Sequence, residues 1–214
     1  MLTSMFYRLA PHLALRSSWR PYRAKPQERV LILRSGPAFP PAHPTTRLCL
    51  DLLKGALTSG PVTRLLDLGC GSGILALAAA ALGVAGVVGV DLSWQAVRVS
   101  QDNARRNGLA EAVGWVKGST ESLRPPFQVI VANLPWSVQW EKVEELDRLA
   151  DFPGTLILSG FRDTQEEPLL HLYQAKGWGP TCRLTRDEWL PELPPEKSFT
   201  WVAWSLARHP GGSV

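Results

Sequence analysis

The chain has 214 residues, 45% of them hydrophobic, which is enough to bury the core of one large domain. Its three cysteines are widely spaced, without a C-x-x-C pair or a histidine cluster beside them. This argues against a disulfide framework and a bound metal and favours a reducing cytoplasm. The longest apolar run, residues 74–90, contains Gly83 and Gly86 and is shorter than the roughly 20 residues of a membrane span, so we expect no membrane contact.

The formal net charge is +4, and the N-terminal segment carries a large excess of basic residues. Residues 1–27 contain four arginines and one lysine but no acidic residue. Such a segment can bind phosphate groups, and its composition is also typical of an organelle transit peptide. We expect residues 1–28 to form a basic arm, either solvated or packed on the main domain as a leader. The main domain is expected at 29–208, followed by a short tail at 209–214.

Residues 29–34 form a short apolar run that stops at a Ser-Gly-Pro sequence, which indicates an edge strand or a lead-in hairpin. The following segment, 36–44, contains four prolines and is not expected to be regular. Thr45 stands directly before a mostly apolar stretch. We therefore expect Thr45 to be the N-cap of a helix that ends near Gly60-Pro61.

From residue 62 onward, apolar runs alternate with stretches of helical pattern, which predicts a parallel sheet with helices on both faces. The last two apolar segments, 181–189 and 198–206, flank a Pro-rich connection with no room for a crossover helix, so we expect an antiparallel hairpin at the sheet edge. Strands are predicted at 63–68, 86–90, 113–116, 127–132 and 155–158, and helices at about 72–82, 93–107, 138–150 and 163–176.

A glycine-rich turn, with Gly69, Gly71 and Gly73 at alternate positions, follows the first of these strands and opens a helix. Glycine permits the tight turn and lets a ligand lie against the main chain at the helix N-terminus. Asp91 ends the next strand about 20 residues later, where its carboxylate can accept hydrogen bonds from both hydroxyls of a ribose. Together these features predict a cofactor that contains a ribonucleoside.

A nicotinamide dinucleotide is the rival cofactor, because Gly71-x-Gly73-x-x-Ala76 satisfies the relaxed dinucleotide fingerprint. Asp67 argues against it, since a carboxylate just before the turn suits an ammonium group and repels a pyrophosphate. The terminal hairpin also replaces the second mononucleotide-binding half of such a fold. A third alternative is that the glycines only make a tight turn.

Residues 66–75, Leu-Asp-Leu-Gly-Cys-Gly-Ser-Gly-Ile-Leu, resemble motif I of the class I methyltransferases. This resemblance implies S-adenosyl-L-methionine as the cofactor, held by Asp67, the three glycines and Asp91. It also implies a Rossmann-like α/β fold with a seven-stranded, mostly parallel sheet and a C-terminal antiparallel hairpin. Similarity to the PrmA family of ribosomal protein methyltransferases covers about residues 19–208 and is carried by residues 36–39, 43–50, 88–91, 96–97, Asn103, 107–108, 131–133 and 154–160.

Two departures from the PrmA pattern stand out. We expect this chain to lack the N-terminal substrate-recognition domain of the family. In addition, Pro-Pro-Ala at 40–42 replaces the Gly-Thr-Gly that the family has before its histidine, which should stiffen the loop over the cofactor.

The fourth predicted strand ends in Asn133-Leu134-Pro135-Trp136, at the edge where open α/β sheets bind ligands. This sequence resembles the Asn/Asp-Pro-Pro-aromatic motif of amino methyltransferases, which implies that the Asn133 side-chain oxygen accepts a hydrogen from the acceptor nitrogen. Trp136 could stack on a base or on a cationic amine. Alternatively, Pro135 merely ends the strand and Trp136 packs on the domain surface.

Further cofactor contacts are predicted for Thr45, Leu92, Ser119, Thr120 and Asn133, while His43 could touch either the cofactor or the substrate. The function that the sequence favours is methyl transfer to nitrogen, most of all to an amino group of a protein of ribosomal type. Trp136 and the basic arm would instead suit a methyltransferase that acts on bases of rRNA or tRNA. A cofactor-binding module without catalysis is the remaining alternative. The sequence does not indicate an oligomeric state.

Overall fold

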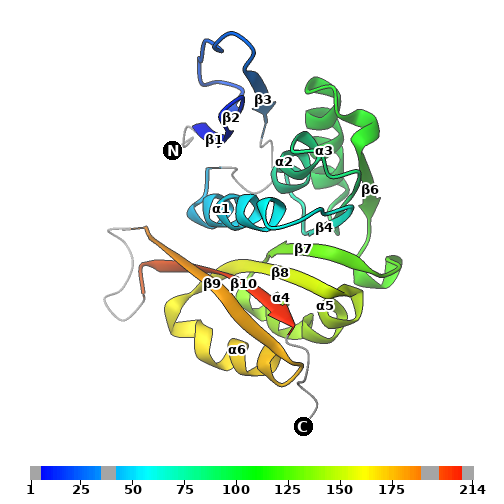
Figure 1. Cartoon of the computed structure of the whole chain (residues 1–214), viewed down its shortest axis with the longest axis vertical. Coiled ribbons are helices and arrows are strands. Elements are labelled where there is room, and N and C mark those ends of the chain that lie inside the picture. Colours follow the sequence, from blue (N-terminus) through cyan, green and yellow to red (C-terminus); the bar gives the residue numbers. More distant parts are fainter. Residues whose placement is uncertain (1–5, 35–41, 189–197, 209–214) are drawn as a thin grey trace.

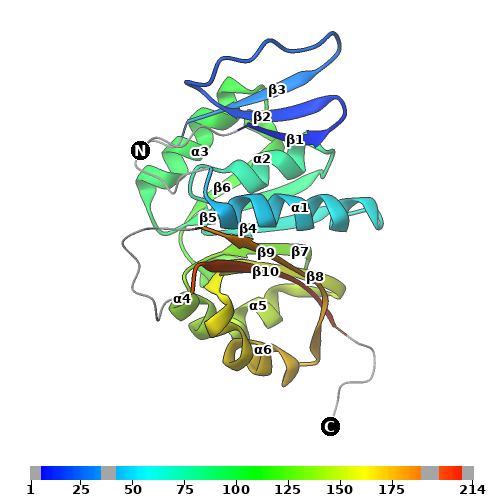
Figure 2. The same ribbon diagram turned by 90° about the vertical axis from the view of Figure 1, so that its left-hand side faces the viewer.

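The computed structural model describes residues 6–34, 42–188 and 198–208. These residues form a large mixed sheet with helices on both faces and a small sheet beside it (Figures 1 and 2). The small sheet contains β1 (Phe6–Ala10), β2 (Leu13–Ser17) and β3 (Arg29–Leu33). The large sheet contains β4 (Arg64–Leu68), β5 (Gly86–Asp91), β6 (Val113–Lys117), β7 (Phe127–Asn133), β8 (Ala150–Arg162), β9 (Trp178–Asp187) and β10 (Thr200–Arg208). The α-helices are α1 (Pro44–Thr58), α2 (Ile74–Ala81), α3 (Trp94–Arg106), α4 (Trp136–Glu141), α5 (Val143–Leu149) and α6 (Glu166–Gln174).

Within the described residues, the seven strands of the large sheet lie in the order β6-β5-β4-β7-β8-β10-β9. The first five of these are parallel, and β10 runs antiparallel to both β8 and β9. The predicted fold, a Rossmann-like α/β sheet with a C-terminal antiparallel hairpin, is confirmed. The chain leaves β4 toward β5 on one side and returns to β7 on the other, so the carboxyl ends of β4 and β7 mark the switch point of the sheet.

Alternate residues of the central strands face opposite layers of helices. Leu65 of β4 and Val131 of β7 belong to the core that includes α1 and α2, whereas Leu66 and Ile130 belong to the core that includes α5 and α6. All four side chains are fully buried. Burial on both faces explains why these strands read as continuous apolar runs in the sequence, as is typical of a parallel sheet.

The N-terminal segment is a sheet packed on the domain, not a solvated arm. β1 pairs antiparallel with β2, and β2 pairs parallel with β3, so the boundary expected at residue 28 cuts through this sheet. Leu13, Leu15 and Leu31 are at most 1% exposed and share a core with α1 and α2. β3 therefore belongs to the small sheet and not to the edge of the large one. The small sheet packs on α1 and α2 because its leucines are apolar and must be covered.

Helix α1 has a different N-cap from the one expected. Pro44 occupies the first helical position, and His43 is the cap, with its Nδ1 accepting from the backbone N–H of Thr45 at 3.3 Å. The prediction that Thr45 caps the helix was wrong, because the cap lies before a proline whose missing N–H is not needed in the first turn. The predicted end of the helix near Gly60 agrees with α1 ending at Thr58.

Two of the predicted helices differ in detail from the observed ones. The stretch expected at 138–150 is two helices, α4 and α5, which meet at Lys142 with φ −99° and ψ 5°. Its last residue, Ala150, already starts β8, which is much longer than the predicted 155–158. The stretch expected at 163–176 begins with a 3-10 turn at Asp163–Gln165 before α6.

Candidate functional site

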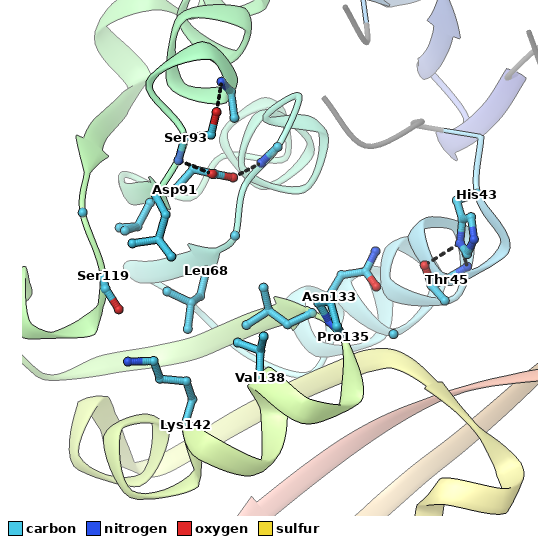
Figure 3. Close-up of a pocket in the computed structure, with 18 of the residues that line it drawn as sticks. His43, Thr45, Leu68, Asp91, Ser93, Ser119, Asn133, Pro135, Val138 and Lys142 are labelled. Carbon is cyan, nitrogen blue, oxygen red and sulfur yellow. Dashed lines mark hydrogen bonds between the residues drawn. The ribbon is translucent and has the colours of Figure 1, made fainter. Parts of the chain in front are cut away.

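A cavity of about 550 Å³ opens at the carboxyl ends of β4, β5 and β7, at the switch point of the sheet (Figure 3). This volume is in the range of sites that hold a cofactor or drug-sized ligand. Eight of the predicted site residues line it, namely Thr45, Gly69, Gly71, Asp91, Leu92, Ser119, Asn133 and Pro135. Four others, Asp67, Gly73, Thr120 and Trp136, are not among the lining residues.

The glycine turn after β4 forms one wall of the cavity. Gly69 has φ +72°, and a Cβ at this position would come within 2.3 Å of Leu134 Cδ2, so only glycine fits without displacing that side chain. Gly73 serves a different purpose, since it caps α2 at φ +77° and a Cβ there would come within 2.7 Å of the Trp115 ring. The turn therefore brings backbone to the cavity at Gly69 and Gly71, while Gly73 allows α2 to pack closely.

Asp91, at the end of β5, ties the two loops beside the cavity together. Its Oδ2 accepts from the backbone N–H of Gly71 at 2.9 Å, and its Oδ1 accepts from the backbone N–H of Ser93 at 2.8 Å (Figure 3). Each carboxylate oxygen has a second lone pair with which it can accept a hydrogen bond from a ligand. Because both oxygens are held by backbone, the carboxylate is oriented before any ligand arrives.

Asp67 lies beneath the turn and not in the cavity. It is 1% exposed, and its Oδ2 accepts from the backbone N–H of Ala76 in the first turn of α2 at 3.0 Å. Burial raises the pKa of Asp67 to about 7, the Ala76 hydrogen bond lowers it, and the nearby charge of Asp91 raises it further. This placement holds the turn on α2 and does not present the carboxylate to a ligand's ammonium group, in contrast to the expectation.

Asn133, at the end of β7, projects into the cavity between the Asp91 side and the start of α1 (Figure 3). Among the described residues, its side-chain amide has no hydrogen-bond partner. The strand end that carries it is fixed from below by the buried Gln139, whose Nε2 donates to the backbone oxygens of Ala132 at 2.7 Å and Ser159 at 2.8 Å. Asn133 thus has an unpaired side-chain amide at the end of a strand whose backbone is held in place by Gln139.

Trp136 turns away from the cavity. Its Nε1 donates to the backbone oxygen of Gln165 at 3.1 Å, and its ring packs against Trp140 with 5.3 Å between the ring centroids. This arrangement is the surface-packing alternative for Trp136. Pro135 lines the cavity and is the N-cap of α4.

The β6 side of the cavity contains Ser119 and a residue that the sequence did not single out. Thr120 is fully buried behind Ser119 and does not face the cavity. Lys142, at the break between α4 and α5, lines the cavity instead. Helical periodicity alone predicted one continuous helix here, so it carried no signal that Lys142 stands at a break.

The opposite end of the cavity is lined by His43 and Trp201, whose rings meet edge to face at a centroid distance of 4.9 Å. The Arg162 guanidinium lies 3.5 Å above the Trp201 ring, and the Trp201 Nε1 donates to Glu188 at 2.6 Å. Burial is the main cause that lowers the pKa of His43 below its usual value. Trp201 comes from the C-terminal hairpin, and its partner at the cavity is more than 150 residues away in sequence, so no local pattern indicates this pairing.

Comparison with known protein families gives a match over most of the chain. The family model described as ribosomal protein L11 methyltransferase (PrmA) matches residues 7–192. The chain belongs to the PrmA family. The match begins at β1, so the small N-terminal sheet is part of the family pattern, which was expected to start only near residue 19.

Individual PrmA relatives agree with this assignment. A ribosomal protein L11 methyltransferase from Syntrophotalea carbinolica is 38% identical over 185 residues, which cover 85% of this chain and 60% of the relative. One from Thermotoga petrophila is 36% identical over 162 residues, covering 75% of this chain and 60% of the relative. The crystal structure of a ribosomal protein L11 methylase from Lactobacillus delbrueckii subsp. bulgaricus superimposes with a TM-score of 0.79 at 25% identity, covering 95% of this chain and 99% of that chain. The chain spans about 60% of the length of the first two relatives.

Members of the PrmA family are class I methyltransferases that use S-adenosyl-L-methionine. The cavity fits this cofactor, because it offers a backbone turn without Cβ atoms at Gly69, a pre-oriented carboxylate at Asp91 and the exposed side chain of Leu92. In the described part of the chain, no group of three or more His, Cys, Asp or Glu side chains is placed to hold a metal ion. No helix among the same residues has the length and apolar character needed to cross a bilayer.

Proposed function

We propose that this chain transfers the methyl group of S-adenosyl-L-methionine to a nitrogen acceptor, an amino group on a protein side chain. The observation that carries this proposal is Asn133, which presents an unpaired amide to the cavity beside the oriented Asp91 carboxylate. The names of the relatives, ribosomal protein L11 methyltransferases, support a ribosomal protein as the acceptor molecule. A location in the cytoplasm, where ribosomes are made, belongs to the same proposal.

In this function the cavity residues divide into those that hold the cofactor and those that support its site. Asp91 accepts hydrogen bonds from the ribose hydroxyls, Gly69 and Gly71 bring the main chain against the ligand, and Leu92, Ser119 and Thr45 complete the contact surface. Asp67, Gly73 and Thr120 act from outside the cavity by fixing the turn, the start of α2 and the loop after β6. The bound cofactor supplies an electrophilic methyl group.

The task of Asn133 is to orient the acceptor. Its side-chain oxygen accepts a hydrogen bond from an N–H of the neutral amine, which leaves the nitrogen lone pair directed at the methyl carbon. Positioning of this kind lowers the barrier by several kcal/mol without a proton-abstracting residue, and correct placement depends on the rigid end of β7. Pro135 contributes by fixing the main chain directly after Asn133.

The nucleic-acid alternative rested on Trp136 and on the basic arm. Trp136 packs against Trp140 and donates to Gln165, and the N-terminal segment packs on α1 and α2, so neither feature favours RNA as the acceptor. A cofactor-binding module without catalysis would leave the Asn133 amide without a task.

The direct test supplies purified protein and S-adenosyl-L-methionine labelled in its methyl group to a bacterial lysate, and then separates protein, RNA and small molecules. The proposal predicts label in protein, at a protein with the size of a ribosomal protein. The Asn133→Ala variant serves as the matched control and should leave the protein fraction unlabelled. Label in RNA, or no transfer although the cofactor binds, would contradict the proposal.

A further inference from the structure

Lys142 lines the cavity at the end opposite His43 (Figure 3). Its side chain is 23% exposed, and its Nζ donates to Thr120 Oγ1 at 3.3 Å and to Glu121 Oε1 at 3.2 Å. Both acceptors belong to the short turn Thr120–Ser122 that follows β6. Lys142 itself stands between α4 and α5, so its side chain reaches from the helix side of the cavity to the turn that follows β6.

An ammonium group has three protons to donate. Among the described residues, Thr120 and Glu121 are the acceptors that Lys142 Nζ reaches, which leaves one proton for a ligand in the cavity. The Glu121 side chain is 68% exposed, whereas the Lys142 side chain is 23% exposed. Lys142 has therefore lost more of its hydration than Glu121 has. A hydrogen bond from a partly dehydrated cation is stronger than one from a cation in open water.

The turn does not depend on Lys142 alone for its attachment to the helices. The Arg148 guanidinium of α5 donates to the Thr120 backbone oxygen at 3.1 Å and therefore holds the same turn independently. A lysine that only fastened this turn would duplicate that contact. Its position at the cavity surface instead gives this end of the site a directed cationic donor.

The surroundings of Lys142 match a flat, mostly apolar ring with acceptor atoms at its edge. Val138, one helical turn before Lys142 on α4, lines the same cavity, as do Leu92 and Gly118. Apolar side chains suit the faces of a purine, and the ring nitrogens of adenine are unprotonated acceptors at its edge. Asp91, which is placed for a ribose, lies on the same side of the view as Lys142 in Figure 3, and Asn133 lies to the right of both.

We propose that Lys142 recognises the adenine ring of the cofactor by donating a hydrogen bond to one of its ring nitrogens. This rests on the proposed function, which supplies an adenosyl ligand. The hydrogen bonds to Thr120 and Glu121 hold the ammonium at the cavity surface. Lys142 is thereby a residue that determines base specificity, since a ring with a C–H group at the contacted position cannot accept the bond.

The test measures binding by calorimetry, with S-adenosylhomocysteine and three analogues in which a C–H group replaces N1, N3 or N7 of adenine. The proteins compared are the parent chain, Lys142→Met, Lys142→Arg and Lys176→Met. Lys176 is a matched control, because it is 26% exposed, pairs with Glu144 at 2.7 Å and does not line the cavity. The parent should bind one of the analogues about tenfold more weakly than S-adenosylhomocysteine, as for a lost hydrogen bond to a charged donor.

In Lys142→Met the penalty for that analogue should shrink to less than twofold, while Lys176→Met should keep it in full and Lys142→Arg should keep part of it. Equal weakening of all four ligands in Lys142→Met would show that the lysine only fastens the turn and would overturn the proposal. So would a parent protein that binds the three analogues as tightly as S-adenosylhomocysteine. If the parent binds none of the four ligands, the proposed function itself fails, and this inference fails with it.

Discussion

Asp67 and Asp91 show how two carboxylates beside one glycine turn acquire different tasks from their surroundings. Asp91 faces the cavity and accepts from two backbone N–H groups with separate oxygens. Asp67 is enclosed and accepts from Ala76 at the start of α2. The sequence predicts both acids as cofactor ligands, because a pattern of residue types does not reveal which carboxylate points outward.

Replacing Asp91 by Ala should weaken binding of S-adenosylhomocysteine by about 1.5–3 kcal/mol, as for lost hydrogen bonds to a charged acceptor. The fold should survive, because the large sheet does not depend on this side chain. Calorimetric titration measures the affinity, and Asp91→Asn, which keeps one acceptor oxygen, should fall between the parent and Asp91→Ala. An affinity unchanged from the parent would exclude Asp91 as the ribose ligand.

Asp67 gives the native state a pH dependence whose sign follows from its raised pKa. Its pKa is about 7 in the folded protein and about 4 in the unfolded chain, so the folded state holds the proton more tightly. The contribution to stability is complete below about pH 4 and is lost as the pH rises to about 7. Asp67→Asn keeps an acceptor for Ala76 and should lack this loss, which amounts to at most about 4 kcal/mol. Urea unfolding of both proteins at about pH 4.5, 6 and 8, which span the titration of Asp67, measures the difference, and a constant difference across these pH values would contradict the assignment.

The small N-terminal sheet is the element that the sequence interpretation described least well. Charge dominated that interpretation, since residues 1–27 include basic residues and no acids. The leucines of β1 and β2 decide the structure instead, because they are buried against α1 and α2. Pairing between β2 and β3 crosses a connection of more than ten residues, and no local period indicates it.

Leu15→Ala tests the structural importance of this sheet. Leu15 is fully buried, so its truncation should lower the free energy of unfolding by about 2–5 kcal/mol. Affinity for S-adenosylhomocysteine should stay within a few-fold of the parent, because β2 does not line the cavity. The exposed Arg23→Ala is the control and should unfold like the parent. A solvated arm would instead make the two variants equally stable.

At the scale of the whole molecule, the alternation of strands and helices from residue 63 onward was sufficient to predict the large sheet and the edge at which its cavity opens. The glycine turn, Asp91 and Asn133 were predicted because they follow strands directly, and parallel strands bring their carboxyl ends to one edge. Lys142 and Trp201 could not be predicted in this way. Their places depend on a helix break and on a hairpin that packs across the sheet, which are properties of the tertiary structure.

The measurement that tests the central claim most directly is the single-turnover rate of methyl transfer by Asn133→Ala, on the acceptor protein identified by labelling, together with its affinity for S-adenosylhomocysteine. If Asn133 orients the attacking nitrogen, the rate should fall by at least roughly 10²-fold, which corresponds to about 2.7 kcal/mol. The affinity should stay within a few-fold of the parent. Asn133→Asp, which keeps the acceptor oxygens, should retain some activity. A normal rate in Asn133→Ala, or a defect confined to cofactor binding, would contradict the claim.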